Sequence, residues 1–233
     1  MGLLNPENTN FPNGLTNRNA SDIFGSMGQL DPTKFVTVMD DFLTYDSNDY
    51  AITGAGTIAI AGEPGGSITM TTQAVDDDSL ILLGQEYNVG TPTGVGAYFA
   101  TRLRLGTAEV VQSDLFVGLV GDGTSVTDPG AGSGGIYFAK ADGSADLSFN
   151  VDTGSGIVTV SGIHTMVNQQ YVTLAAFADG QGRVYYSVNG TTQGYLDATP
   201  LADNQTIGVG LQAGEAAAKR IECDYLFTAF ERE

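Results

Sequence analysis

The sequence predicts an all-β protein, a two-sheet antiparallel jelly-roll sandwich that follows an extended N-terminal arm. Three observations predict this fold class. Hydrophobic residues make up 42% of the 233 residues, which is ample for a packed core. The 32 glycines and a charged fraction of only 15% indicate many short elements joined by tight turns. From residue 35 onward, apolar or alternating runs follow one another at hairpin spacing, and no helical periods alternate with them.

Residues 1–34 form the predicted arm, and residues 35–233 form the predicted jelly-roll domain. The arm is rich in Asn, Pro, Thr and Gly and shows no period of two or of 3.6 residues. Its isolated apolar residues cannot cover one another, so we expect them to pack against the chain's own domain or against a neighbouring subunit. The predicted partner-binding residues of the arm are Leu3, Leu4, Phe11, Leu15, Ile23 and Phe24.

Roughly twelve to fourteen short strands are expected after the arm, because that many β-type runs are separated by turn residues. In order, the expected strands cover residues 35–43, 50–60, 67–72, 80–83, 98–105, 115–120, 136–139, 147–151, 157–163, 171–177, 184–188, 207–211 and 221–230. Packing two sheets of such strands face to face buries the apolar side of each strand.

Two of these strands indicate where the core lies. Residues 98–105 alternate, with apolar side chains on one face and Arg102 and Arg104 on the other. Residues 115–120 are apolar on both faces, which is typical of a strand in the middle of a sandwich. We therefore expect the centre of the core beside these two segments.

The connections are mostly turns. Asp179-Gly180 and Asn189-Gly190 are predicted hairpin turns, because both dipeptides tolerate the positive φ that tight hairpins need. Residues 214–220 have strong helix propensity, but the segment is too short to be stable alone. It is interpreted as either one helical turn or a loop.

The net charge of −18 disfavours binding to nucleic acid or to an anionic membrane surface. It is expected to keep the protein soluble, or to steer it toward a basic surface or cations. No window reaches the length of apolar sequence that a membrane span needs. The first residues lack the basic and apolar regions of a secretory signal, so we expect a protein made in the cytoplasm.

Groups for catalysis are scarce. His164 is the only histidine and Cys223 the only cysteine, so a usual zinc site lacks its ligands. No Gly-x-Ser-x-Gly stretch occurs that would supply the nucleophile of a Ser-His-Asp triad. Glu222 and Asp224 share one face of a strand, but as isolated acids opposite apolar residues they are interpreted as solvent-facing. The sequence therefore predicts a protein that is not an enzyme, with no catalytic, cofactor-binding or metal-binding residues.

Two binding hypotheses stay open. Asp40-Asp41 and the acidic turn at residues 76–78 could supply oxygen ligands for calcium, although solvated turns are the simpler interpretation. Tyr185 and Tyr195 could stack on a sugar, although half-buried packing is more typical of tyrosine in a sandwich.

Three stretches resemble the concanavalin A-like (laminin G-like) jelly roll. They are MDDF at residues 39–42, YVTLAAF at residues 171–177 and VYYSVNG at residues 184–190. The resemblance implies the fold and no activity.

The two ends of the chain resemble virion structural proteins of tailed bacteriophages. The matching stretches are NPENTNFPNGLTN at residues 5–17, PTKF at residues 32–35 with DDF at residues 40–42, and GLQAGEAAAKRIECDYLF at residues 210–227. This resemblance implies a capsid decoration or cement protein, bound through its arm to the major capsid protein and neighbouring virion subunits. The implied location is the capsid surface, after assembly in the host cytoplasm. The alternative is a glycan-binding host-recognition module displayed on the virion.

Overall fold

The structure is a computed structural model that describes residues 35–62, 65–88, 96–121, 124–130, 134–197 and 204–231. The predicted arm and its six predicted partner-binding residues lie outside the described residues, so their placement stays a prediction.

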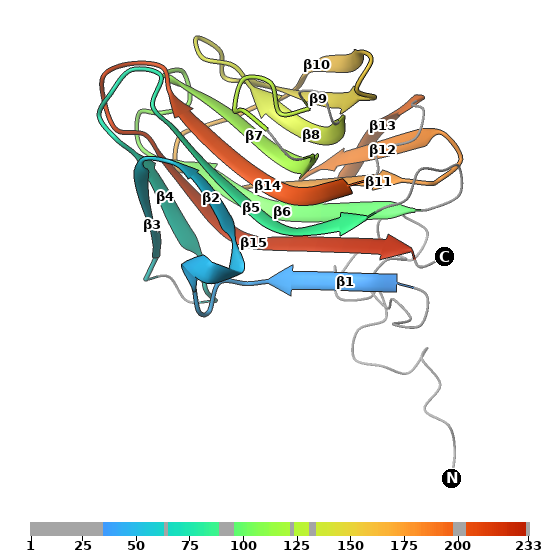
Figure 1. The fold of residues 1–233 in the computed structure, drawn as a ribbon. Helices are drawn as coiled ribbons and strands as arrows, with labels where there is room; N and C mark the ends of the chain where they lie inside the picture. The colour runs from blue at the N-terminus through green and yellow to red at the C-terminus, as the bar shows by residue number, and fades with distance from the viewer. Residues whose placement is uncertain are drawn as a thin grey trace.

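The described chain folds into two sheets that lie face to face (Figure 1). The eight-stranded sheet has the order β13-β12-β11-β6-β15-β4-β3, and β1 also pairs with β15. Its strands are β1 (Phe35–Asp40), β3 (Gly56–Ile60), β4 (Ile68–Thr72), β6 (Ala97–Leu105), β11 (Val172–Ala178), β12 (Arg183–Val188), β13 (Thr191–Asp197) and β15 (Arg220–Glu231).

The seven-stranded sheet has the order β10-β9-β8-β7-β14-β5-β2. Its strands are β2 (Ala51–Gly54), β5 (Ser79–Asn88), β7 (Ser113–Val120), β8 (Gly135–Lys140), β9 (Asp146–Asp152), β10 (Ile157–Thr165) and β14 (Asn204–Ala213). Every pairing in both sheets is antiparallel. The prediction of an all-β, two-sheet antiparallel sandwich is confirmed.

The core fills the space between the two sheets, where the predicted alternation holds. On β6, Leu103 and Leu105 are fully buried, whereas Arg102 and Arg104 point outward to acidic partners. Hairpin prediction also holds at Asn189 and Gly190, whose φ angles are 49° and 82°. A chain of aromatic rings, each in contact with the next, crosses the core: Phe99, Phe138, Phe149 and Tyr186.

β7 is buried on both faces, as its sequence predicts. On its outer face, the Phe116 ring lies against β14, where a Cβ added to Gly210 would come within 2.1 Å of that ring. Val126 and Tyr137 join Phe116 in one buried cluster on this side of the sheet. Apolar side chains therefore close the middle of the outer face of the seven-stranded sheet.

The outward acids of β15 differ from the interpretation of the sequence. Glu222 is 6% exposed rather than solvent-facing. Its carboxylate accepts a hydrogen bond from Arg104 Nε at 2.7 Å and forms an ion pair with Arg220 at 2.8 Å. Asp224 accepts a hydrogen bond from Arg102 at 2.6 Å. The alternation gave the correct face, but it could not show that the partner strand β6 places two arginines opposite these acids.

Residues 214–217 form a bend rather than a helical turn, and β15 begins at Arg220. The buried Lys219 ammonium donates a hydrogen bond to the Glu215 carboxylate at 2.5 Å in this bend. Within the described residues, no helix is both long and apolar enough to cross a membrane.

Candidate functional site

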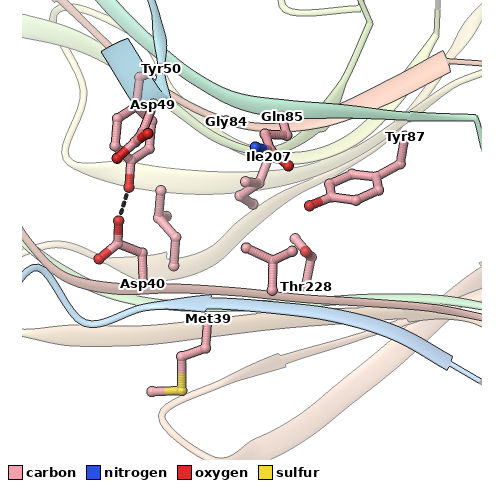
Figure 2. A pocket seen from close by; sticks show the side chains of 11 residues that line it. Met39, Asp40, Asp49, Tyr50, Gly84, Gln85, Tyr87, Ile207 and Thr228 are labelled. Atoms are coloured by element: carbon pink, nitrogen blue, oxygen red, sulfur yellow. Dashed lines mark hydrogen bonds between the residues drawn. The ribbon is translucent and has the colours of Figure 1, made fainter. Parts of the chain in front are cut away.

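A pocket of about 190 Å³ opens between the two sheets beside β1 (Figure 2). Its walls come from β1, β5, β14 and β15, and from the short 3-10 helix η3 (Ser47–Asp49) with the residue that follows it. This volume lies below the range of pockets that hold drug-sized ligands, so the space suits one small molecule or the end of a longer one.

Asp40 is the central acid of the pocket, and a strained turn positions it. Phe42 adopts a φ of 51°, which is uncommon for a residue other than glycine, and its side chain is fully buried. The Phe42 backbone N–H donates to Asp40 Oδ1 at 2.7 Å, and the Tyr50 hydroxyl donates to Asp40 Oδ2. The buried ring of Phe42 thus fixes the turn that holds the carboxylate in place.

Tyr50 reaches the pocket because η3 shapes the chain just before it. The Asp46 side chain caps η3 by accepting a hydrogen bond from the Asn48 backbone N–H at 2.9 Å. The Tyr50 ring stacks against Tyr45 with a centroid separation of 5.9 Å. Asp49, the last residue of η3, also lines the pocket and brings a second carboxylate.

The opposite wall depends on a β-bulge in β5. The register between β5 and β14 shifts so that Gly84 and Gln85 together face Ile207. The shift turns Tyr87 inward, where its ring stacks on Phe230 at 5.0 Å. In Figure 2, Tyr50 and Tyr87 lie at opposite ends of the pocket.

Two buried hydroxyl groups in the pocket lack hydrogen-bond partners within the described part of the chain. They are Tyr87 Oη and Thr228 Oγ1, and no described residue pairs with either atom. Thr228 is 1% exposed and points from β15 toward the other sheet. Buried polar atoms without partners are unfavourable, so a ligand that pairs with both hydroxyls would offset that cost.

The electrostatics of the pocket favour a ligand without negative charge. Burial raises the pKa of Asp40 above its usual range, and the neighbouring Asp41 and Asp49 carboxylates raise it further. Burial also raises the pKa of Tyr87, so its hydroxyl stays protonated. Among the described residues that line the pocket there is no Lys, Arg or His to pair with an anion.

The residues singled out in the sequence divide between the pocket and other surfaces. Asp40 lies in the pocket, but no group of three or more His, Cys, Asp or Glu residues in the described part of the chain is placed to hold a metal ion. Tyr185 and Tyr195 lie on the eight-stranded sheet, with side chains on the face opposite to the core. Glu222 and Asp224 lie on that same outer face, bound to arginines.

Tyr87 and Thr228 were missed because no local pattern marks them. Leu80 and Leu82 point inward on β5, so simple alternation would turn Tyr87 outward, and only the bulge reverses it. Thr228 sits among apolar residues of β15 and is indistinguishable by pattern from a packing residue. The stretch at residues 39–42, with its candidate calcium ligands Asp40 and Asp41, was the one signal near the site.

No protein-family model and no curated protein sequence matches the chain. Solved structures do match it, at low identity. Peanut lectin superposes with a TM-score of 0.62 and 10% identity over 85% of this chain and 99% of the lectin. The carbohydrate recognition domain of Emp47p gives 0.61 and 12%, over 88% of this chain and all of that domain (100%).

A β-glucanase of Bacillus licheniformis is similar to the same extent, with a TM-score of 0.57 and 12% identity over 82% of this chain and 97% of the enzyme. These structures show that the chain has the concanavalin A-like jelly-roll fold, as its sequence predicts. The fold is shared by lectins and by enzymes, so it does not decide between binding and catalysis.

Proposed function

We propose that the chain is a carbohydrate-binding module that holds a neutral sugar ring in the pocket beside β1. The observation that carries this proposal is the pair of buried hydroxyls, Tyr87 Oη and Thr228 Oγ1, that have no described partner and face a space lined by carboxylates. A sugar presents several hydroxyl groups on one small ring, each able to donate and to accept a hydrogen bond. It can therefore pair with both protein hydroxyls together.

The tyrosine rings supply the other half of sugar recognition. Tyr50 and Tyr87 flank the pocket from opposite ends, and each ring is held by an aromatic neighbour. Aromatic rings pack well against the apolar C–H face of a sugar, and the Tyr87 hydroxyl has no partner among the described residues, so it can pair with a sugar hydroxyl. Rings that are already fixed lose little conformational freedom on binding.

The charge of the pocket selects among sugars. With Asp40 and Asp49 in the lining and no basic side chain among the described lining residues, acidic sugars and phosphates meet repulsion that nothing offsets. Neutral sugars are therefore the favoured class. The names of the similar structures, a lectin, a carbohydrate recognition domain and a glucanase, support a carbohydrate as the ligand.

We propose binding without cleavage. Both oxygens of Asp40 already accept hydrogen bonds, from the Phe42 backbone and from Tyr50. A carboxylate engaged in this way is poorly suited to pass a proton to a leaving group. Release of reducing ends from a β-glucan by the purified protein would overturn this part of the proposal.

The resemblance of the two ends of the sequence predicts a capsid decoration role. The similar structures named above give this role no support. The glycan-binding alternative is therefore the function proposed. Display of this module on a virion, with the major capsid protein as partner, stays a prediction of the sequence resemblance.

Sugar binding is tested by isothermal titration calorimetry with a panel of neutral, acidic and amino sugars. Tyr87→Phe and Thr228→Val each remove one unpaired hydroxyl and keep the shape of the side chain. Each should weaken binding of a neutral sugar by about fivefold while leaving the free energy of unfolding unchanged or higher. Asp197→Asn on the far strand β13 is the matched control, because Asp197 is highly exposed and distant from the lining residues. If no neutral sugar in the panel binds the wild-type protein, the proposal is wrong.

A further inference from the structure

Two β-bulges lie beside the pocket, one in each sheet. The register between β5 and β14 shifts at Gly84 and Gln85, as described above. The register between β15 and β6 shifts between Cys223 and Tyr225, so Asp224 is the extra residue there. An extra residue reverses the side of the strand on which every later side chain lies. The two bulges therefore decide which later residues of β5 and β15 face the pocket.

Both pocket hydroxyls that lack a partner in the described chain point inward because of these bulges. On β15, Cys223 lies in the core before the bulge, and Leu226 and Phe230 lie in the core after it. Regular alternation from Cys223 would instead turn Thr228 outward. The bulge in β5 reverses Tyr87 in the same way. In Figure 2, Tyr87 enters the pocket from one sheet and Thr228 from the other.

A buried threonine on the neighbouring strand binds the backbone at each bulge. Thr206 of β14 donates its hydroxyl hydrogen to the Gly84 carbonyl oxygen at 2.8 Å. Thr101 of β6 donates to the Tyr225 carbonyl oxygen, also at 2.8 Å. Thr206 is 5% exposed and Thr101 is 0% exposed, so water does not compete strongly for either hydroxyl. A bulge interrupts the ladder of backbone hydrogen bonds, and a side-chain donor can supply the bond that the ladder loses.

Open space lies on both sides of the β5 bulge. Gly84 lines the pocket beside β1 and also a second hollow of about 220 Å³, which Leu83 and Thr206 line from the outer side of the sheet. Gly84 has no side chain to pack, and a Cβ added to it would lie 2.9 Å from the Ile207 side chain. The hydrogen bond from Thr206 is therefore the described contact that fixes the carbonyl of this backbone.

We infer that Thr206 and Thr101 are positioning residues of the pocket, because their hydroxyls hold the two bulges that turn Tyr87 and Thr228 inward. Loss of either hydroxyl leaves the extra residue in the strand but allows the bulge to shift along it. Such a shift changes the direction of the side chains that follow. The placement of the two pocket hydroxyls does not depend on the ligand, whereas the effect on sugar binding rests on the proposed function.

Fluorine NMR of protein labelled with fluorotyrosine tests the inference, because each bulge has a tyrosine beside it. The chain has ten tyrosines, and the two resonances of interest are identified by their absence from Tyr87→Phe and Tyr225→Phe. The shift between light and heavy water measures how far a ring is exposed to solvent. Thr206→Val should raise this solvent shift for Tyr87 about twofold. Thr101→Val should move the Tyr225 resonance, and serine at either threonine position keeps the hydroxyl and should keep the wild-type spectrum.

Ser148→Ala is the matched control. The Ser148 hydroxyl donates to the Ala139 carbonyl oxygen at 3.1 Å between β9 and β8, where the register has no shift. Its removal should leave the Tyr87 and Tyr225 resonances in place. A wild-type Tyr87 resonance in Thr206→Val protein would overturn the inference. So would a Thr206→Ser variant that changes this resonance as much as the valine variant does.

Deletion of Gln85 keeps the inference testable if Thr206→Val does not fold. The deletion removes the extra residue, so β5 and β14 can pair regularly while Tyr87 still faces inward. Adding Thr206→Val to the deletion protein should then give a folded chain with the Tyr87 resonance of the deletion protein alone. A resonance that still moves, or a deletion protein that does not fold, contradicts the inference.

Sugar calorimetry on the same variants is read separately. Thr206→Val should weaken binding of a neutral sugar about fivefold. It should add no further loss in Tyr87→Phe protein, because the threonine acts through the Tyr87 hydroxyl, and losses that multiply in the double variant contradict this coupling. Expected resonance changes without any sugar binding overturn the glycan proposal alone. Sugar binding with unchanged resonances overturns the inference alone.

Discussion

Lys140 shows how this sandwich treats a buried charge. The side chain is 2% exposed, and Nζ donates hydrogen bonds to the backbone carbonyls of Ser113, Ala141 and Ser144. Burial lowers the pKa of Lys140 to about 8, although the nearby Asp114 and Asp142 carboxylates act in the opposite direction. The amine therefore serves as a cross-link between β7 and the turn that follows β8.

Replacing this lysine should weaken the fold. Lys140→Met keeps much of the apolar volume but leaves three carbonyls without their donor, so the free energy of unfolding at pH 7 should fall by about 2 kcal/mol. The difference between wild type and variant should then widen from pH 8 toward pH 10, because the unfolded lysine still binds a proton there and the folded one has lost it. Urea denaturation at several pH values measures both effects. A difference that narrows over this range would contradict the lowered pKa.

Cys223 is a buried side chain that stays uncharged. It is fully buried, and burial raises the pKa of its thiol to about 12. The thiolate is the reactive form, so the native protein should react with a thiol reagent at least a hundredfold more slowly than the protein unfolded in guanidinium. The thiol reagent is one that releases a chromophore, so the absorbance of the solution measures the rate of the reaction. Rapid reaction of the native protein would show that β15 does not place this residue in the core.

At the scale of elements, the glycines of β14 fit the aromatic ring of a neighbouring strand. An added Cβ at Gly210 would lie 2.1 Å from the ring of Phe116, and one at Gly208 would lie 3.1 Å from it. The ring and the bare backbone are therefore complementary, and the pairing of β7 with β14 at Phe116 and Gly210 holds them in register. The sequence of either strand alone does not predict this fit between ring and glycine.

Gly210→Ala should lower the free energy of unfolding by about 1–3 kcal/mol, because the new methyl group displaces a packed ring. Adding Phe116→Leu should recover part of that loss, since the smaller side chain makes room. Thermal and urea unfolding of the two single variants and the double variant give the coupling between the positions. Simple additivity of the two losses would argue against this contact.

The strands themselves were largely predictable, but their irregularities were not. Alternation was enough to place Leu103 and Leu105 in the core, because a two-residue period is a property of one strand. The bulge at Gly84 and the positive φ of Phe42 depend on what lies across the sheet or beneath the turn. Glu222 was misassigned in part for the same reason, since Arg104, one of its two arginine partners, lies on the neighbouring strand β6.

At the scale of the whole molecule, the fold class was predictable while the pocket was not. Composition and strand spacing indicate a sandwich, because many weak local signals add up over the chain. The pocket instead joins Asp40, Tyr50, Tyr87 and Thr228 from four separate segments. No local pattern could bring them together, because their proximity exists only once both sheets have formed.

The pairing of β1 with β15 ties the order of synthesis to the appearance of the pocket. The first described strand pairs with the last, so this contact joins two distant parts of the described chain and cannot form until β15 has left the ribosome. Until β15 has been synthesised, β1 and its residue Asp40 have no partner strand. A premature stop before β15 therefore yields a chain with an open sheet edge and no ligand site, rather than a weaker version of the same protein.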